Sequence, residues 1–146
     1  MAYTAPVEAG FVMLFARSVG DTDPVYGDQL AAGTGEQLVT PPTFVRALDH
    51  FDPTSRTRPS LPTLSPDFGG SPNMVHAEQH FEYLAPFRAG EQVVVEAFEG
   101  RTWTKNGRSG RLDFSETVTE YRRSDGDVLV RARKVSVRTI SQDADA

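Results

Sequence analysis

The feature that most constrains this chain is the run of β-patterned sequence that fills its C-terminal half. Four strands are expected there, over residues 76–84, 91–104, 111–122 and 127–139. The separators are short and contain turn signals, namely Arg88-Ala89-Gly90, Asn106-Gly107 and Asp125-Gly126. Such pairs are typical of tight hairpin connections between antiparallel strands. The sequence therefore predicts a meander of long antiparallel strands.

A sheet of this kind has an apolar face that another layer must cover, and two helices are expected before it. The first, over residues 6–19, carries apolar side chains at three- and four-residue spacing. Gly20 follows it at the position where a left-handed residue commonly ends a helix.

The second helix is expected to begin at Thr40 as its cap, because Thr40 is followed by Pro41 and Pro42. Its apolar stripe then falls at positions i, i+3, i+4 and i+7, which are Phe44, Ala47, Leu48 and Phe51. This helix is the natural element for the strands to wrap around. The pattern predicts an α+β hot-dog fold, in which a long antiparallel sheet wraps around a central helix. Trp103 and Tyr121 are expected to pair across strands of that sheet.

Prolines and glycines fill residues 52–75 and exclude regular structure there. Neither flank could fold alone, so this segment is interpreted as a long loop on one domain rather than as a linker. Residues 1–146 are accordingly expected to form a single hot-dog domain, with a disordered tail at 140–146.

Composition excludes several classes of function. The chain has 15 basic and 20 acidic residues, a net charge of -5, which argues against nucleic-acid binding through bulk charge. It contains no cysteine, so disulfides, thiol nucleophiles and thiolate metal sites are excluded. No apolar run approaches the ~20 residues that span a bilayer, and the N-terminus lacks the features of a signal peptide. A cytoplasmic protein that binds neither membranes nor nucleic acid is expected.

Three segments resemble a known family, and they are, in chain order, FARSVGDTDPVY (residues 15–26), VTPPTF (39–44) and HAEQHFEY (76–83). The first resembles the hydratase motif of MaoC-like dehydratases, which are hot-dog enzymes of acyl thioesters. The second resembles that family's entry into the central helix. The third resembles the FAS1-like dehydratase, or MaoC N-terminal, domains.

The resemblance implies syn addition of water across a 2-enoyl thioester, or its reversal. Active members hold the water with an aspartate and a histidine in an Asp-x-Asn-Pro-x-His pattern. Here Asp21 and Pro24 match that pattern, Asp23 replaces the asparagine, and Tyr26 stands where the histidine should be. An unperturbed tyrosine titrates near pH ~10 and is a poor base near neutrality. Asp21 and Tyr26 remain candidate catalytic residues, although Asp21 could equally brace the loop beside Pro24.

Alternate residues of the third segment share one face of a strand, so His76, Glu78, His80 and Glu82 could point the same way. His76 or Glu78 could supply the acid/base function missing at Tyr26. Alternatively these side chains form an exposed polar face or a metal site, of which the metal site is the less favoured. The resulting candidates are His76 for catalysis, no metal ligands, and for substrate binding Asp23, Pro24, Pro42, Thr43 and Glu78.

Basic residues gather around one predicted hairpin, at Arg101, Lys105, Arg108 and Arg111. They could contact the phosphates of coenzyme A or of an acyl-carrier protein, or simply form a solvated tip. No glycine-rich phosphate loop, serine elbow or redox motif is present, and no cofactor is expected.

The resemblance therefore implies an (R)-specific enoyl-CoA hydratase or 3-hydroxyacyl-thioester dehydratase subunit, a hydro-lyase. Because Tyr26 replaces the histidine, the chain is interpreted as the half that shapes the acyl pocket for a catalytic MaoC-like partner. Such halves commonly make room for bulky acyl groups, such as steroids or very long chains. The alternatives are a self-sufficient homodimer that uses Asp21 and His76, a hot-dog acyl-CoA thioesterase, and a ligand-binding module.

Overall fold

The computed structural model of the 146-residue chain describes residues 2–27, 38–54, 74–108 and 110–140. Most of the predicted Pro/Gly-rich loop and nearly all of the predicted C-terminal tail lie outside these residues. The elements are, in order, β1 (Tyr3–Pro6), α1 (Ala9–Ser18), η1 (Pro24–Tyr26), η3 (Pro42–Phe51), β2 (Met74–Tyr83), β3 (Gln92–Gly107), β4 (Gly110–Arg123) and β5 (Val128–Ile140).

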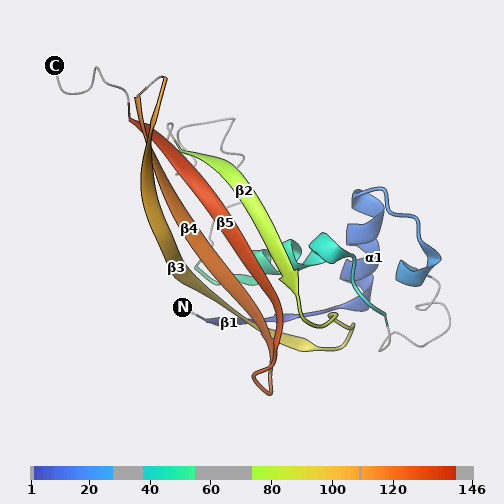
Figure 1. The fold of residues 1–146 in the computed structure, drawn as a ribbon. Helices are drawn as coiled ribbons and strands as arrows, with labels where there is room; N and C mark the ends of the chain where they lie inside the picture. The colour runs from blue at the N-terminus through green and yellow to red at the C-terminus, as the bar shows by residue number, and fades with distance from the viewer. Residues whose placement is uncertain (1, 28–37, 55–73, 109, 141–146) are drawn as a thin grey trace. The chain divides into compact units, whose positions relative to one another are not determined.

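The strands form one five-stranded antiparallel sheet in the order β1-β3-β4-β5-β2 (Figure 1). The predicted α+β hot-dog fold is confirmed, and so is the meander of β3, β4 and β5. β1 was not predicted, because its four residues are too few to show a period. It pairs antiparallel with β3, with Tyr3 opposite Val95 and Pro6 opposite Gln92.

Most element boundaries differ from the prediction by one to three residues, and two of the differences concern the candidate site. β2 begins at Met74 in place of His76, so Met74 and Val75 belong to a strand rather than to the loop. The second helix begins at Pro42 and has Pro41, not Thr40, at its cap position, without a side-chain cap bond. The reason is steric: a residue that precedes a proline avoids the helical region, so Pro41 stays extended, with ψ 148°.

The chain divides into two compact units. The first unit comprises Met1–Ser55, Glu82–Glu96 and Glu120–Arg131, and the second comprises Arg56–Phe81, Ala97–Thr119 and Ala132–Ala146. Each unit is described by itself below. The expectation of a single domain over residues 1–146 stays a prediction.

The core of the first unit is built on η3, which is a 3₁₀ helix. Its side chains Phe44, Val45 and Leu48 are fully buried and Ala47 nearly so, as the predicted stripe requires, whereas Phe51 is 37% exposed. Phe11 of α1 meets the Phe44 ring edge-on at 5.3 Å. Burial of this stripe against the strands is what holds the helix in place, since apolar burial is the main favourable term in folding.

A polar cluster fixes the other side of η3. The Tyr121 hydroxyl donates to Oδ1 of Asp49 at 2.8 Å, and Arg46 forms an ion pair with Asp49 at 2.6 Å. Burial, and then the Asp49 carboxylate, raise the pKa of Tyr121 well above its ordinary value. Tyr121 therefore stays protonated and keeps its donor bond to the helix throughout the neutral range.

The predicted pairing of Trp103 with Tyr121 is wrong. The Trp103 ring stacks on Phe114 with centroids 5.1 Å apart, and Tyr121 meets Phe87 at 6.2 Å instead. The sequence could not settle this pairing because a strand's partner residues depend on the register, which no local pattern specifies here.

No helix in the described parts of the chain is long and apolar enough to cross a membrane.

Candidate functional site

Four of the predicted site residues line one hollow in the first unit. Its volume is about 280 Å³, and it is lined by Met13, Ala16, Arg17, Asp21, Thr22, Asp23, Pro24, Tyr26 and Gly27. α1 supplies one wall and the segment around η1 supplies the other. The predicted motif residues Asp21, Asp23, Pro24 and Tyr26 are thus brought together.

Short-range hydrogen bonds shape this segment. Gly20 ends α1 in the left-handed conformation, with φ 76°, as its position predicted. Oδ1 of Asp21 then accepts the N–H of Asp23 at 3.1 Å. Oδ1 of Asp23 accepts the N–H of Val25 at 3.0 Å and so caps η1, which Pro24 begins. The loop-bracing role that the sequence allowed for Asp21 is therefore observed, and Asp21 still lines the hollow.

The electrostatics of Tyr26 decide what its hydroxyl can do. Partial burial raises its pKa, and the carboxylates of Asp21 and Asp23 raise it further, because a phenolate beside them would be repelled. At neutral pH the Tyr26 hydroxyl is protonated. It can donate a hydrogen bond to a bound oxygen, but it cannot serve as a general base.

A second, more apolar hollow in the first unit has a volume of about 400 Å³. It is lined by Thr40, Pro42, Tyr83, Leu84, Ala85, Pro86, Phe87 and Val130. The Tyr83 hydroxyl donates to the Pro42 carbonyl at 2.8 Å and ties the end of β2 to the start of η3. Pro42, a predicted substrate-binding residue, thus lines a hollow different from that of Asp21. Thr43, which was also predicted to bind substrate, is exposed on η3 and lines neither hollow.

Sequence reasoning did not single out Tyr83 or Phe87 for this second hollow. Tyr83 ends the HAEQHFEY segment, in which the predicted site residues were His and Glu at alternating positions. A signal existed, because a tyrosine beside Leu84, Ala85 and Pro86 makes a small apolar stretch in an otherwise polar region.

The residues predicted on β2, His76 and Glu78, belong to the second unit. His76 is exposed, and its Nε2 lies 2.9 Å from the backbone oxygen of Glu78. The Glu78 carboxylate bonds Nε2 of His80 at 2.8 Å, and this hydrogen bond lowers the pKa of Glu78. Among the described residues, no group of three or more His, Asp or Glu is placed to hold a metal ion.

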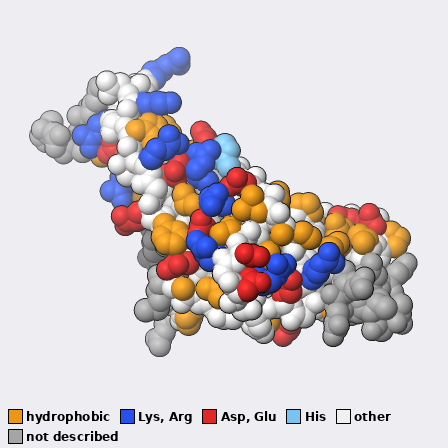
Figure 2. All heavy atoms as spheres, turned by 60° about the horizontal axis from the view of Figure 1, so that its bottom comes forward, with side chains coloured by type: hydrophobic (Ala, Val, Ile, Leu, Met, Phe, Trp, Pro, Cys, Tyr) orange, Lys and Arg blue, Asp and Glu red, His pale blue; other side chains and the backbone are white. Residues whose placement is uncertain are grey.

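The basic side chains of the predicted hairpin have different contacts. Arg101 contacts Glu116 at 3.3 Å and lies over the Trp103 ring, whereas Lys105 lies over the ring of Phe114. The Glu116 side chain is only 7% exposed, and its carboxylate also forms an ion pair with Arg133 at 3.0 Å. Figure 2 shows basic and acidic side chains interspersed in this way over one face of the molecule.

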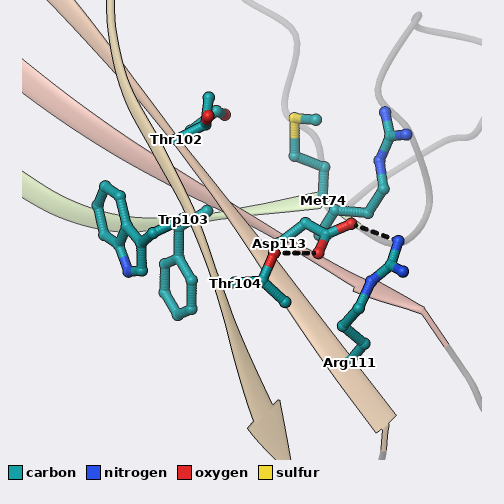
Figure 3. Close-up of a pocket in the computed structure, with 9 residues that line it drawn as sticks. Met74, Thr102, Trp103, Thr104, Arg111 and Asp113 are labelled. Carbon is teal, nitrogen blue, oxygen red and sulfur yellow. Dashed lines mark hydrogen bonds and ion pairs between the residues drawn. The ribbon is translucent and has the colours of Figure 1, made fainter.

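A third hollow, of about 580 Å³, lies in the second unit (Figure 3). It is lined by Met74, Thr102, Trp103, Thr104, Arg111, Asp113, Phe114, Ser115 and Arg138. Asp113 accepts hydrogen bonds from Arg111 and from the Thr104 hydroxyl, each at 3.0 Å. The hollow combines charged and hydroxyl side chains with Met74, Trp103 and Phe114. It contains Arg111, which the sequence offered as a possible phosphate contact, and none of the predicted catalytic or substrate-binding residues.

Comparison with known proteins agrees with this architecture. A family model described as the FAS1-like dehydratase domain region matches residues 2–132. Over 99 residues the chain is 35% identical to a UPF0336 protein of Streptomyces coelicolor, a match that covers 63% of this chain and 61% of that protein. The chain thus spans about six tenths of the length of that curated relative.

Two solved structures from Mycobacterium tuberculosis share the fold. One is the HadBC (3R-hydroxyacyl-ACP dehydratase) complex, with a TM-score of 0.67, 21% identity and 94% of both chains covered. The other is the ChsH1-ChsH2 complex, with a TM-score of 0.70, 19% identity, and 99% of this chain and 85% of that chain covered. At these identities the likeness shows the fold alone.

The five-stranded sheet, the helix packed on it and the motif at Asp21 define a hot-dog protein of the MaoC-like dehydratase type. Within that class, the chain belongs to the FAS1-like dehydratase domain region family. The resemblance seen in three sequence motifs is confirmed.

Proposed function

We propose that this chain is a subunit of an (R)-specific 2-enoyl-thioester hydratase, acting also as a 3-hydroxyacyl-thioester dehydratase, and that it is the half with an incomplete Asp/His site. The observation that carries the proposal is that Asp21 and Tyr26 line one hollow, in the positions of the family's catalytic aspartate and histidine. The family assignment supports the reaction class.

The missing histidine is the chemical reason to expect a partner for this half. Hydration places the water oxygen on Cβ of the enoyl group and a proton on Cα, so one group must take a proton and one must give it. Asp21 offers a carboxylate that can hold the water. Tyr26, whose pKa is raised, can donate but cannot accept. Loss of the motif's histidine would remove much of a general-base contribution that is typically worth ~10²–10⁴ in rate.

A second MaoC-like subunit would supply the intact pair. The two neighbours named above are each described as a complex of subunits, HadBC and ChsH1-ChsH2, and the first is described as a 3R-hydroxyacyl-ACP dehydratase. By analogy, the substrate of this chain is an acyl group on coenzyme A or on a carrier protein. The hollow lined by Pro42, Tyr83 and Phe87 is the apolar surface that an acyl chain would contact.

The test is hydration of a panel of 2-enoyl-CoAs, from short to steroid-sized, followed by loss of enoyl absorbance. The purified chain alone should give no turnover, and turnover should appear on mixing with a MaoC-like subunit that has an intact Asp/His pair. An Asp21→Asn variant of this chain should bind the same subunit and serves as the matched control for assembly.

Three results would overturn the proposal. Turnover by the chain alone that Asp21→Asn or His76→Ala abolishes would establish the self-sufficient homodimer. Release of free thiol from acyl-CoA would establish a thioesterase. Binding of thioesters without turnover in any pairing would establish a ligand-binding module.

A further inference from the structure

The hollow of the second unit, lined by Arg111 and Arg138, has no role in the function proposed above, yet its lining is chemically specific. Three hydroxyl side chains line it, those of Thr102, Thr104 and Ser115, together with the two guanidinium groups of Arg111 and Arg138. Figure 3 shows Thr104, Asp113 and Arg111 joined in one bonded group beside Met74.

The charges in this hollow do not cancel. The Arg111 hydrogen bond, assisted by the Thr104 hydroxyl, lowers the pKa of Asp113, so this carboxylate is ionised and neutralises Arg111. Arg138 is exposed and has no hydrogen bond or ion pair with the residues that the structure describes, although it feels the charge of Asp113. Within the described part of the chain, one guanidinium group is therefore left for an incoming anion.

The surroundings strengthen this field. The described residues of the second unit contain more basic than acidic side chains, although the whole chain has a net charge of -5. The basic ones are Arg101, Lys105, Arg108, Arg111, Arg133, Lys134 and Arg138, and the acidic ones are Glu78, Glu99, Asp113 and Glu116. An anion is thus attracted to this unit, and the described residues of the first unit lack such an excess.

We propose that the hollow lined by Arg111, Arg138 and Thr102 is a phosphoryl-binding site. Guanidinium groups and hydroxyls are the donors that bind phosphate oxygens, and a guanidinium offers two parallel N–H groups to them. The volume of about 580 Å³ lies within the range of small-molecule sites. If the proposed function holds, the phosphoryl group is that of the thioester carrier, which coenzyme A and a phosphopantetheine arm both contain.

The test is a binding titration with two probes. Adenosine 3′,5′-bisphosphate represents the nucleotide end of coenzyme A, and pantetheine 4′-phosphate represents a carrier-protein arm. Trp103 is the chain's single tryptophan and lines the hollow, so its fluorescence reports binding at this place. Arg138→Gln should weaken binding at least about tenfold, because it removes the guanidinium that has no ion pair among the described residues.

The matched control is Arg108→Gln, which removes the same charge from an exposed residue of the same unit that does not line the hollow. It should change the dissociation constant by no more than about twofold. Thr102→Val, which keeps the side-chain shape, is the second variant should Arg138→Gln fail to fold. It should weaken binding without changing the circular dichroism spectrum.

Equal loss in Arg108→Gln and Arg138→Gln would mean general charge attraction and would overturn the site. So would the absence of binding of both probes to the wild-type chain. Neither readout needs turnover, so the two proposals fail separately. Probe binding without hydratase activity in any pairing would support the phosphoryl-binding site and contradict the proposed function. Hydratase activity without probe binding would support the function and contradict the site. The better-bound probe identifies the carrier.

Discussion

At the scale of single residues, the proposed function depends on one position of the family motif. Tyr26 occupies the histidine position of the family motif, and its raised pKa leaves it a donor only. Asp21 is held by the Asp23 N–H, so the carboxylate is already fixed in the hollow. Under the proposed function, the site lacks the histidine of the family motif and retains the aspartate, and restoring the histidine tests this directly.

Tyr26→His should confer hydratase activity on the chain alone. Histidine has an unperturbed pKa of ~6.5 and can take the proton that tyrosine cannot, a contribution of about 10²–10⁴ in rate. Enoyl-CoA hydration by the variant is the measurement. Tyr26→Phe is the control and should stay inactive. No gain in a folded Tyr26→His protein would show that more than the histidine is missing.

Glu116 should make the protein sensitive to acid. The hydrogen bond from Arg133, and that from Arg101, lower its pKa from the ordinary value of 4.5. A lowered native pKa contributes stability above the unfolded value, and this contribution is lost as the pH falls through the native value. Glu116→Gln should therefore be less stable than wild type at pH ~7. In urea titrations the difference in free energy of unfolding between the variant and wild type should shrink as the pH falls below 4.5. A stability difference that does not change with pH would refute this role of the Glu116 carboxylate.

At the scale of elements, η3 is the piece that organises the first unit. Phe44, Val45 and Leu48 are fully buried, and the Asp49–Tyr121 and Tyr83–Pro42 bonds attach the helix at both ends. As a 3₁₀ helix it has poorer hydrogen-bond geometry than an α-helix. Its stability therefore depends on packing rather than on local propensity.

Leu48→Ala should lower the free energy of unfolding by about 2–5 kcal/mol, the usual cost of truncating a fully buried leucine. Thr43→Ala, on the exposed side of the same helix, should change it by less than about 0.5 kcal/mol. Urea denaturation of both variants is the measurement. Similar losses in the two variants would contradict the packing account of η3.

At the scale of the whole molecule, the proposed half-site requires a second subunit. The two structural neighbours compared above are each described as a complex. For this chain, a dimer or heteromer is what the proposed function requires. Sedimentation of the purified chain, alone and with MaoC-like subunits, should give a particle of about twice 16.0 kDa in at least one case. A monomer in every mixture would contradict the assembly.

The fold was largely predictable from the sequence, and so were the local parts of the site. Hairpin signals at Asn106-Gly107 and Asp125-Gly126 and the stripe of Phe44 and Leu48 identified the meander and its helix. Gly20 and Asp21 act through contacts a few residues apart, so their conformation follows from neighbouring residues alone. These features share one physical basis, because each is a short-range or periodic property.

Only the tertiary structure decided the long-range contacts. Tyr121 and Asp49 are 72 positions apart, Tyr83 and Pro42 are 41 apart, and Arg133 and Glu116 are 17 apart. Each contact depends on strand register and on which face a residue occupies, and one residue of slip would reverse every face. The sequence by itself therefore determined the elements and the Asp21 turn with its hollow. Tertiary packing decided which side chains share the hollows of Pro42 and of Arg111.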